Sequence, residues 1–197
     1  LKQTGGRALA GGQTLVNAMK TRLAQPGPLV PLGAVAGLRG IRHTGKSLVI
    51  GAMMRHAEVA ASDEVLRAIP ALAQLANGIG DRQVRNRGTI GGSVANNDPA
   101  ACYPSAVLGL GALVHTTERT IAAEEFFVSM YETALREGEL ITDIEFPIPR
   151  RAAYVKFHQK ASRFALVGVF VASTDAGVRV AVTGAASAVF RATEIEK

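Results

Sequence analysis

Apolar residues follow two spacings along the chain, and each spacing predicts one kind of element. A spacing of three to four residues predicts helices over 15–23, 62–76 and 124–135, and small residues predict a short helix over 105–113. Apolar runs or alternation predict strands over 29–30, 47–50, 140–146, 154–157, 167–172 and 178–182. The last residues, 193–197, are expected to begin another helix. Helices and strands are thus both expected.

Serine and proline residues mark where several of these elements are expected to begin or end. Ser62, followed by two acidic residues, is expected to start a helix, because acids in the first turn interact well with the helix dipole. Pro70 is expected to kink that helix or to restart it. The segment Pro147–Pro149, followed by two arginines, is the best candidate for a domain boundary. The predicted domains are therefore 1–150 and 151–197.

Segment 78–104 differs in character from its surroundings. It is dense in glycine, asparagine and arginine and has neither helical nor strand periodicity. We expect a long loop here, and loops of this length are usually functional.

Composition supports a packed core rather than a membrane or secreted protein. The 197 residues are 48% hydrophobic and 19% charged, which suits one sizeable domain or one domain plus part of a second. The longest apolar stretch, 164–172, is too short to span a bilayer, and no leader is expected before the first globular segment. The single cysteine, Cys102, cannot form an internal disulfide, so a reducing compartment, the cytoplasm, is expected.

The net charge of +6 comes from the N-terminal part of the chain. Residues 1–60 carry eight lysines and arginines against one acid, whereas residues 61–197 carry fourteen against fifteen. A nucleic-acid surface, an anionic small ligand, an acidic partner or ordinary solvated charge would each explain this bias. Aromatic residues that could stack on bases are few, with no tryptophan.

The segment Gly40–Ser47 fits the phosphate-binding pattern Gly-x4-Gly-Lys-Ser. That loop needs a helix after it, but the residues that follow Ser47 are Leu-Val-Ile-Gly, which predict a strand. A hairpin turn is the better interpretation, and a nucleotide-binding loop remains the alternative.

Two other glycine pairs are better placed to bind an anion. The first, in Ala10–Thr14, joins a predicted strand to a predicted helix, and the second, in Gly88–Ser93, lies in the long loop. Adjacent glycines let a ligand approach the backbone, and successive N–H groups in such turns form anion sites. Together the two turns could hold a dinucleotide diphosphate, although neither has the Rossmann pattern and each could be an ordinary tight turn.

The sequence contains no motif typical of a metal site, a nucleophile or an acid–base pair. The four histidines lack the spacing of metal ligands, and no nucleophile elbow or convincing pair of catalytic carboxylates occurs. Any chemistry is therefore expected to come from a cofactor.

The two glycine turns together resemble the FAD-binding subunit of molybdenum hydroxylases, the medium subunit of the xanthine dehydrogenase and aerobic carbon monoxide dehydrogenase type. The similarity rests on Ala10–Leu15, on Gln83–Ala101 with its Arg-Asn-x-Gly-Thr-Ile-Gly-Gly-Ser signature, and on 138–147 and 154–163. It implies an α+β fold: a two-lobed FAD-binding domain of the vanillyl-alcohol-oxidase-like (PCMH) type, followed by the start of a small antiparallel-sheet C-terminal domain.

The resemblance also implies which residues contact FAD. They are Ala10, Gly11, Gly12, Gln13, Thr14 and Leu15 of the first turn, Thr89, Ile90, Gly91, Gly92 and Ser93 of the second, and Ile79, Cys102, Ile141 and Lys160 elsewhere. Cys102 stands where the family often has an aspartate, so one polar contact is expected to be weaker. The chain is also expected to be truncated, because the family has a strand and helix before the first turn and a longer C-terminal domain.

The implied function is electron transfer in an oxidoreductase complex. Electrons would pass from a molybdopterin-binding large subunit through 2Fe-2S clusters of a small subunit to FAD on this chain, and then to an external acceptor. Neither nucleic acid nor a membrane span is expected. The alternatives are the nucleotide-binding loop at Gly40–Ser47 and an assembly subunit without flavin.

Overall fold

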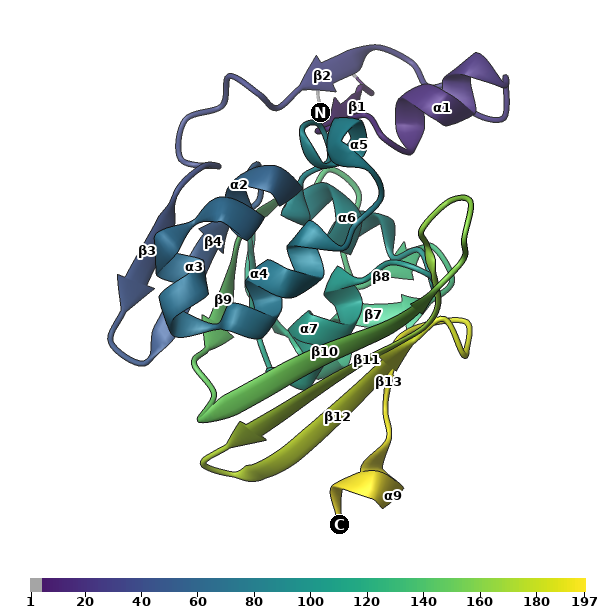
Figure 1. The fold of residues 1–197 in the computed structure, drawn as a ribbon. Coiled ribbons are helices and arrows are strands. Elements are labelled where there is room, and N and C mark those ends of the chain that lie inside the picture. Colours follow the sequence, from purple (N-terminus) through teal and green to yellow (C-terminus); the bar gives the residue numbers. More distant parts are fainter. Residues whose placement is uncertain (1–4) are drawn as a thin grey trace.

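The computed structural model describes residues 5–197, and its N-terminal segment lies on one side of a larger body (Figure 1). This segment contains the parallel pair β1 (Arg7–Leu9) and β2 (Leu29–Pro31), joined through α1 (Leu15–Lys20). The predicted helix over 15–23 therefore ends early, at Lys20, and Arg22 adopts a positive φ of 60°.

A five-stranded antiparallel sheet forms the centre of the body. Its strands lie in the order β3, β4, β9, β5 and β6, where β3 is Ile41–Thr44, β4 is Ser47–Gly51, β9 is Ile141–Pro147, β5 is Leu113–Thr116 and β6 is Thr120–Ala122. β4 pairs with β9 so that Ile50 lies opposite Ile144, and both side chains are fully buried. The sheet thus joins segments that are far apart in the sequence.

Helices cover the inner side of this sheet and build the main core. They are α2 (His56–Ala61), α3 (Asp63–Ala68), α4 (Pro70–Asn77), α5 (Arg82–Arg85), α6 (Ile90–Asn96), α7 (Tyr103–Gly109) and α8 (Ala123–Phe126). Ser62 starts α3 by accepting a hydrogen bond from the N–H of Val65 at 3.4 Å. Pro70 restarts the helix rather than kinking it, because a residue without an N–H suits the first helical position.

Two predictions about secondary structure are wrong. Segment 78–104 is not a long loop, since Asp81 and Thr89 act as N-caps and start α5 and α6. Segment 124–135 is helical only to Phe126 and then forms the hairpin of β7 (Phe127–Ser129) and β8 (Glu132–Thr133).

Asn97 links this hairpin to the end of α6. It adopts the left-handed conformation with φ 43°, which asparagine tolerates better than most residues. Its buried side-chain amide donates to the carbonyl oxygens of Ser129 and Glu132 at 2.7 and 2.8 Å. The C-terminal end of α6 is therefore tied to the β7–β8 hairpin.

A second antiparallel sheet follows in the order β10, β11, β12 and β13. These strands are Arg151–His158, Ala165–Thr174, Gly177–Thr183 and Phe190–Arg191, and α9 (Thr193–Glu196) follows them. The inner face carries Tyr154 and Phe170 into the main core, whereas Val155 and Phe157 on the outer face are 71% and 72% exposed. The main core includes residues from both sides of residue 150, so it does not mark a domain boundary there. The division into 1–150 and 151–197 therefore stays a prediction.

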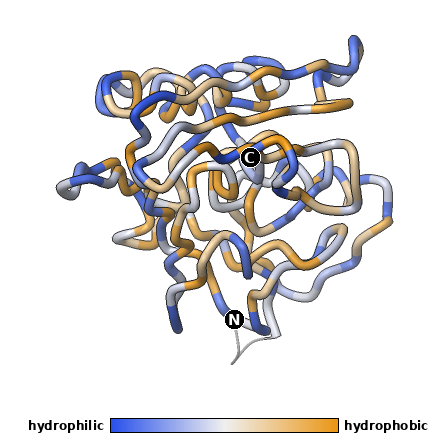
Figure 2. The backbone as a smooth tube through the Cα atoms, turned by 90° about the horizontal axis from the view of Figure 1, so that it is seen from below, coloured by the Kyte–Doolittle hydropathy of each residue, from blue (hydrophilic) through white to orange (hydrophobic). Residues whose placement is uncertain are grey.

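The mixture of helices and sheets confirms the α+β class. Apolar residues are spread along many short elements rather than gathered in one long run (Figure 2). Among residues 5–197, no helix has the length and apolar character needed to cross a membrane.

Candidate functional site

The first glycine turn leaves a row of backbone N–H groups free. It joins β1 to α1, and Gly12 adopts a φ of +74°, a conformation that favours glycine. Among residues 5–197, the N–H groups of Gly11, Gly12, Gln13 and Thr14 donate no hydrogen bond. All four residues are at least partly exposed. A turn with several free N–H groups is suited to hold an anion.

The second glycine turn uses its N–H groups inside the protein. Those of Ile90 and Gly91 donate to the carbonyl oxygens of Met54 and Ala52, and those of Gly92 and Ser93 donate to Thr89. The expectation that both turns present open N–H groups is therefore wrong for the second turn. Gly91 is glycine for a packing reason, because a Cβ there would lie 2.5 Å from the Cβ of Ala52.

The two turns nevertheless lie side by side. A Cβ on Gly11 would lie 2.2 Å from the carbonyl oxygen of Arg87 and 2.8 Å from the Cα of Gly88. A Cβ on Gly92 would lie 3.4 Å from the Cβ of Ala10. The structure thus brings the two predicted segments together, and the lack of side chains at Gly11 and Gly92 permits this approach.

His56 supports the second turn from behind. Its backbone N–H donates to the carbonyl oxygen of Gly88 at 3.0 Å, and its ring lies 5.3 Å from that of Tyr103. Burial, together with the positive charge of Arg85, lowers the pKa of His56 to about 4, so the ring is neutral at neutral pH. The sequence pattern gave His56 no role that set it apart from the other histidines.

A small apolar cluster joins the N-terminal segment to the body beneath the first turn. It contains Leu32, Leu38 and Met53, and Ala8, Ala10 and Leu140 pack against it. The predicted contact Ile141 instead faces the main core and is 5% exposed. Because neighbouring residues at the start of a strand point to opposite sides, Leu140 rather than Ile141 packs against this cluster, as Ala10 does.

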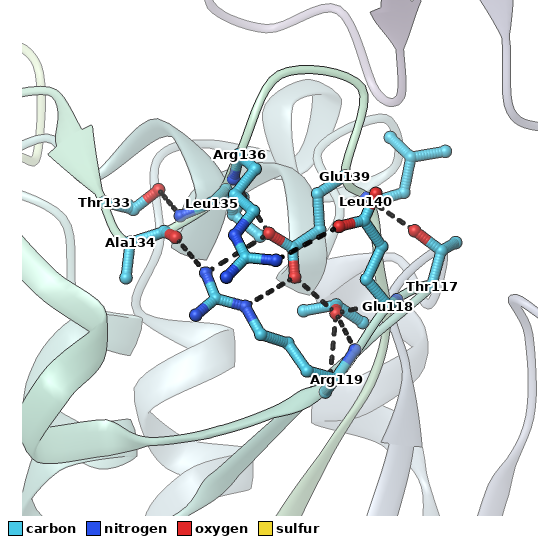
Figure 3. Close-up of polar contacts among 10 residues, drawn as sticks. Thr117, Glu118, Arg119, Thr133, Ala134, Leu135, Arg136, Glu139 and Leu140 are labelled. Carbon is cyan, nitrogen blue, oxygen red and sulfur yellow. Dashed lines mark hydrogen bonds and ion pairs between the residues drawn. The ribbon is translucent and has the colours of Figure 1, made fainter. Parts of the chain in front are cut away.

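A buried carboxylate fixes the backbone around Leu140 (Figure 3). Glu139 accepts hydrogen bonds from the Thr116 hydroxyl at 2.7 Å, from Arg119 Nε at 3.1 Å and from the Arg136 N–H at 2.8 Å. Burial alone would raise the pKa of Glu139, but these hydrogen bonds outweigh it and lower the pKa to about 2. Leu140 itself pairs with Thr117 through two hydrogen bonds.

The remaining predicted contacts lie in other parts of the body. Ile79 is partly buried against the main core, and its carbonyl oxygen accepts a hydrogen bond from Arg85 at 3.0 Å. Cys102 is 5% exposed at the start of α7, with its Sγ atom 3.5 Å from Nζ of Lys156. Lys160 is exposed in the turn between β10 and β11.

The structure contradicts a nucleotide-binding loop at Gly40–Ser47. These residues belong to the β3–β4 hairpin, with Gly45 at a φ of +59° in its turn. Ser47 begins a strand rather than a helix, so no helix N-terminus faces the loop. Within residues 5–197, no group of three or more histidine, cysteine, aspartate or glutamate side chains is placed to hold a metal ion.

The chain is similar in sequence to known proteins of one family. The pattern of the family described as "FAD binding domain in molybdopterin dehydrogenase" matches residues 1–149. The nicotine 6-hydroxylase medium subunit of Paenarthrobacter nicotinovorans is 36% identical, with 96% of this chain and 71% of the relative covered. The carbon monoxide dehydrogenase medium chain of Afipia carboxidovorans is 38% identical, with 87% and 62% covered. The chain thus spans about two thirds of the length of these curated relatives.

Solved structures agree with these relatives. A carbon monoxide dehydrogenase from Hydrogenophaga pseudoflava, in a form that lacks the Mo-pyranopterin moiety of its molybdenum cofactor, matches with a TM-score of 0.89 and 35% identity. The alignment covers 96% of this chain and 71% of that one. Quinoline 2-oxidoreductase from Pseudomonas putida 86 matches with a TM-score of 0.90 and 28% identity over 96% of this chain and 70% of that one.

Proposed function

The chain belongs to the family of FAD-binding domains of molybdopterin dehydrogenases, and from this membership we propose that it binds FAD beside its two glycine turns and carries electrons in a molybdenum hydroxylase complex. The observation that carries the proposal is the contact between Gly11 and the backbone of Arg87 and Gly88. This contact puts a row of free N–H groups next to the second turn. One extended ligand could therefore contact both turns.

The two turns have different roles in this proposal. The free N–H groups of Gly11, Gly12, Gln13 and Thr14 fit a diphosphate, since each can donate to a phosphate oxygen. The second turn could instead offer the hydroxyl group of Ser93, which is partly exposed, whereas Thr89 is buried and its hydroxyl oxygen already accepts from Gly92. Ile90, Gly91 and Gly92 shape the wall against which the ligand lies, and Ala10 and Leu15 flank the first turn.

The flavin ring would lie toward the other predicted contacts. The resemblance makes Ile141 and Lys160 flavin-side positions and makes Ile79 and Cys102 further FAD contacts, and we place all four on the ring side. Near the first turn we add Leu140 to the proposed contacts, because it packs, as Ala10 does, against the small apolar cluster, whereas Ile141 faces the main core. When bound, FAD accepts and releases electrons one or two at a time, and this chain supplies the binding and the electrostatic surroundings.

The other cofactors would belong to partner subunits. With one cysteine, this chain cannot hold a 2Fe-2S cluster, which needs four ligands. We therefore infer a small iron–sulfur subunit and a large molybdopterin-binding subunit, and a cytoplasmic complex that passes electrons through FAD to an external acceptor. Residues 1–150 would form the FAD-binding domain and 151–197 the start of the C-terminal domain.

FAD titration of the purified chain tests the proposal. Binding is measured by the quenching of FAD fluorescence and by the visible absorbance that remains with the protein after gel filtration. We expect one FAD per chain. A folded protein that retains no flavin would contradict the proposal and would favour an assembly role without flavin.

A further inference from the structure

Lys156 lies on the inner face of β10, opposite Gly168 of β11, and its ammonium group is shared among three parts of the fold. Its Nζ atom donates to the carbonyl oxygen of Gly78 at 2.6 Å and to that of Arg163 at 2.9 Å. The third contact is with Sγ of Cys102 at 3.5 Å. An ammonium group has three donors, so these contacts use its full capacity.

The three contacts come from the segments that hold three of the predicted FAD contacts, which we place on the ring side. Gly78 follows α4 and directly precedes Ile79. Arg163, at a φ of +62°, lies in the β10–β11 turn that contains Lys160. Cys102 is itself one of the predicted contacts.

We propose that Lys156 is a positioning residue that holds Ile79, Cys102 and the turn with Lys160 in one arrangement for the flavin ring. This inference rests on the proposed FAD function, and it assigns to Lys156 a part that the family resemblance does not give it. Lys156 acts through backbone carbonyl groups and a thiol rather than by touching the cofactor. Its role is therefore to fix the shape of the ring side, while the diphosphate side is formed by the glycine turns.

The hydrogen bonds within the β10–β11 turn show why the contacts of Lys156, which we call the clamp, matter for its position. The β10–β11 turn closes on itself through Gln159, whose side-chain oxygen accepts from the N–H groups of Ala161 and Ser162. Gln159 and Phe164 also pair through the backbone at 2.9 Å. These bonds shape the turn internally but do not attach it to the body of the protein. Of the side chains in β10, Lys156 is the one that joins this turn to the end of α4.

Substitution of Lys156 by methionine tests the clamp, because methionine keeps an unbranched apolar side chain but cannot donate. Lys156→Arg is the conservative variant, since a guanidinium group can still reach two carbonyl oxygens. Lys46→Met is the matched control, because Lys46 is exposed in the β3–β4 turn. Hydrogen exchange is measured on the protein without FAD, and visible circular dichroism on the protein with FAD.

In Lys156→Met we expect exchange to rise at least about tenfold in both 78–80 and 159–164, since both segments open more often without the clamp. FAD should still bind, with an altered visible circular dichroism spectrum. Lys156→Arg should restore most of both properties, and Lys46→Met should match the wild type.

Unchanged exchange in both segments, or an unchanged flavin spectrum in Lys156→Met, would overturn the inference while leaving the proposed function intact. Failure of the wild-type chain to bind FAD would overturn the proposed function and with it the role toward the ring. Exchange that rises throughout the protein in Lys156→Met, with no rescue by arginine, would show a general structural role and would also overturn the inference.

Discussion

Gly11 and Arg87 are in direct backbone contact, since a Cβ on residue 11 would lie 2.2 Å from the Arg87 carbonyl oxygen. This contact locks the N-terminal segment against the segment that leads into α6. Within the described residues 5–197, the N–H groups of Gly11–Thr14 donate no hydrogen bond, and these residues are at least partly exposed. The candidate FAD site depends on this single close approach.

Gly11→Ala should therefore separate the two turns. The added methyl group overlaps backbone atoms that cannot rotate away, and overpacking of this kind costs about 1–3 kcal/mol in the free energy of unfolding. We expect FAD affinity to fall at least about tenfold, which corresponds to ~1.4 kcal/mol. Both quantities can be measured by urea denaturation and fluorescence titration.

Gly33→Ala is the matched control for this substitution. Nothing lies within 4 Å of a Cβ at residue 33, and its φ is not positive. It should therefore change neither stability nor affinity. Wild-type FAD affinity in Gly11→Ala would contradict the role given to the contact.

Thr89→Val should destabilise the start of α6. The Thr89 hydroxyl oxygen accepts from the N–H of Gly92 at 3.2 Å, and loss of such an N-cap costs about 1 kcal/mol. Thr89→Ser keeps the oxygen and should keep most of the stability. Equal midpoints for the two variants in urea would show that the cap does not stabilise α6.

The low pKa of Glu139 makes the protein sensitive to acid. Its pKa in the folded protein is about 2, below the ordinary value of 4.5, so its contribution to stability is complete above pH 4.5 and is lost as the pH falls to 2. The difference corresponds to about 3 kcal/mol. Glu139→Gln should remove this pH dependence, while Glu125→Gln, on an exposed side chain, should preserve it. Denaturation measured at several pH values below 4.5 would show whether the two variants differ.

His56 should act in a separate and higher pH window. Its pKa is about 4 in the folded protein against 6.5 ordinarily, so the unfolded chain binds the proton more readily between these values. Stability is therefore expected to fall by up to about 3 kcal/mol as the pH drops from 6.5 to 4. His56→Phe should reduce this slope, and substitution of the exposed His43 by glutamine should not. An unchanged slope in His56→Phe would assign the effect to other groups.

Local signals in the sequence were enough to predict much of the fold. Ser62 and Pro70 mark helix starts because their chemistry suits those positions whatever surrounds them. The strand after Ser47 was also predictable, and it argued correctly against a nucleotide-binding loop at Gly40–Ser47. The glycine pairs pointed to two segments that the structure places side by side.

The rest depends on contacts between distant residues. Gly91 and Gly92 weaken a helix by their own propensity, so they indicated a turn. In the structure they lie in the first turn of α6, where Gly91 packs directly against Ala52. Whether Ile141 or Leu140 faces the N-terminal segment likewise depends on the pairing of Ile141 with Thr116. The residue pattern of 113–116 or of 140–146 alone does not predict how these two strands pair.

The side-chain amide of Asn97 has a consequence for how a large ligand reaches this protein. The Thr89 hydroxyl caps the first turn of α6, and the Asn97 amide ties the C-terminal end of α6 to the β7–β8 hairpin. We therefore expect α6 and the second glycine turn to keep their positions when a ligand binds. The purple segment above them in Figure 1 rests on a small apolar cluster, and α1 contributes no buried residue. Any movement that admits a dinucleotide is therefore expected in the N-terminal segment rather than in α6, and it would have to break the contact between Gly11 and Arg87.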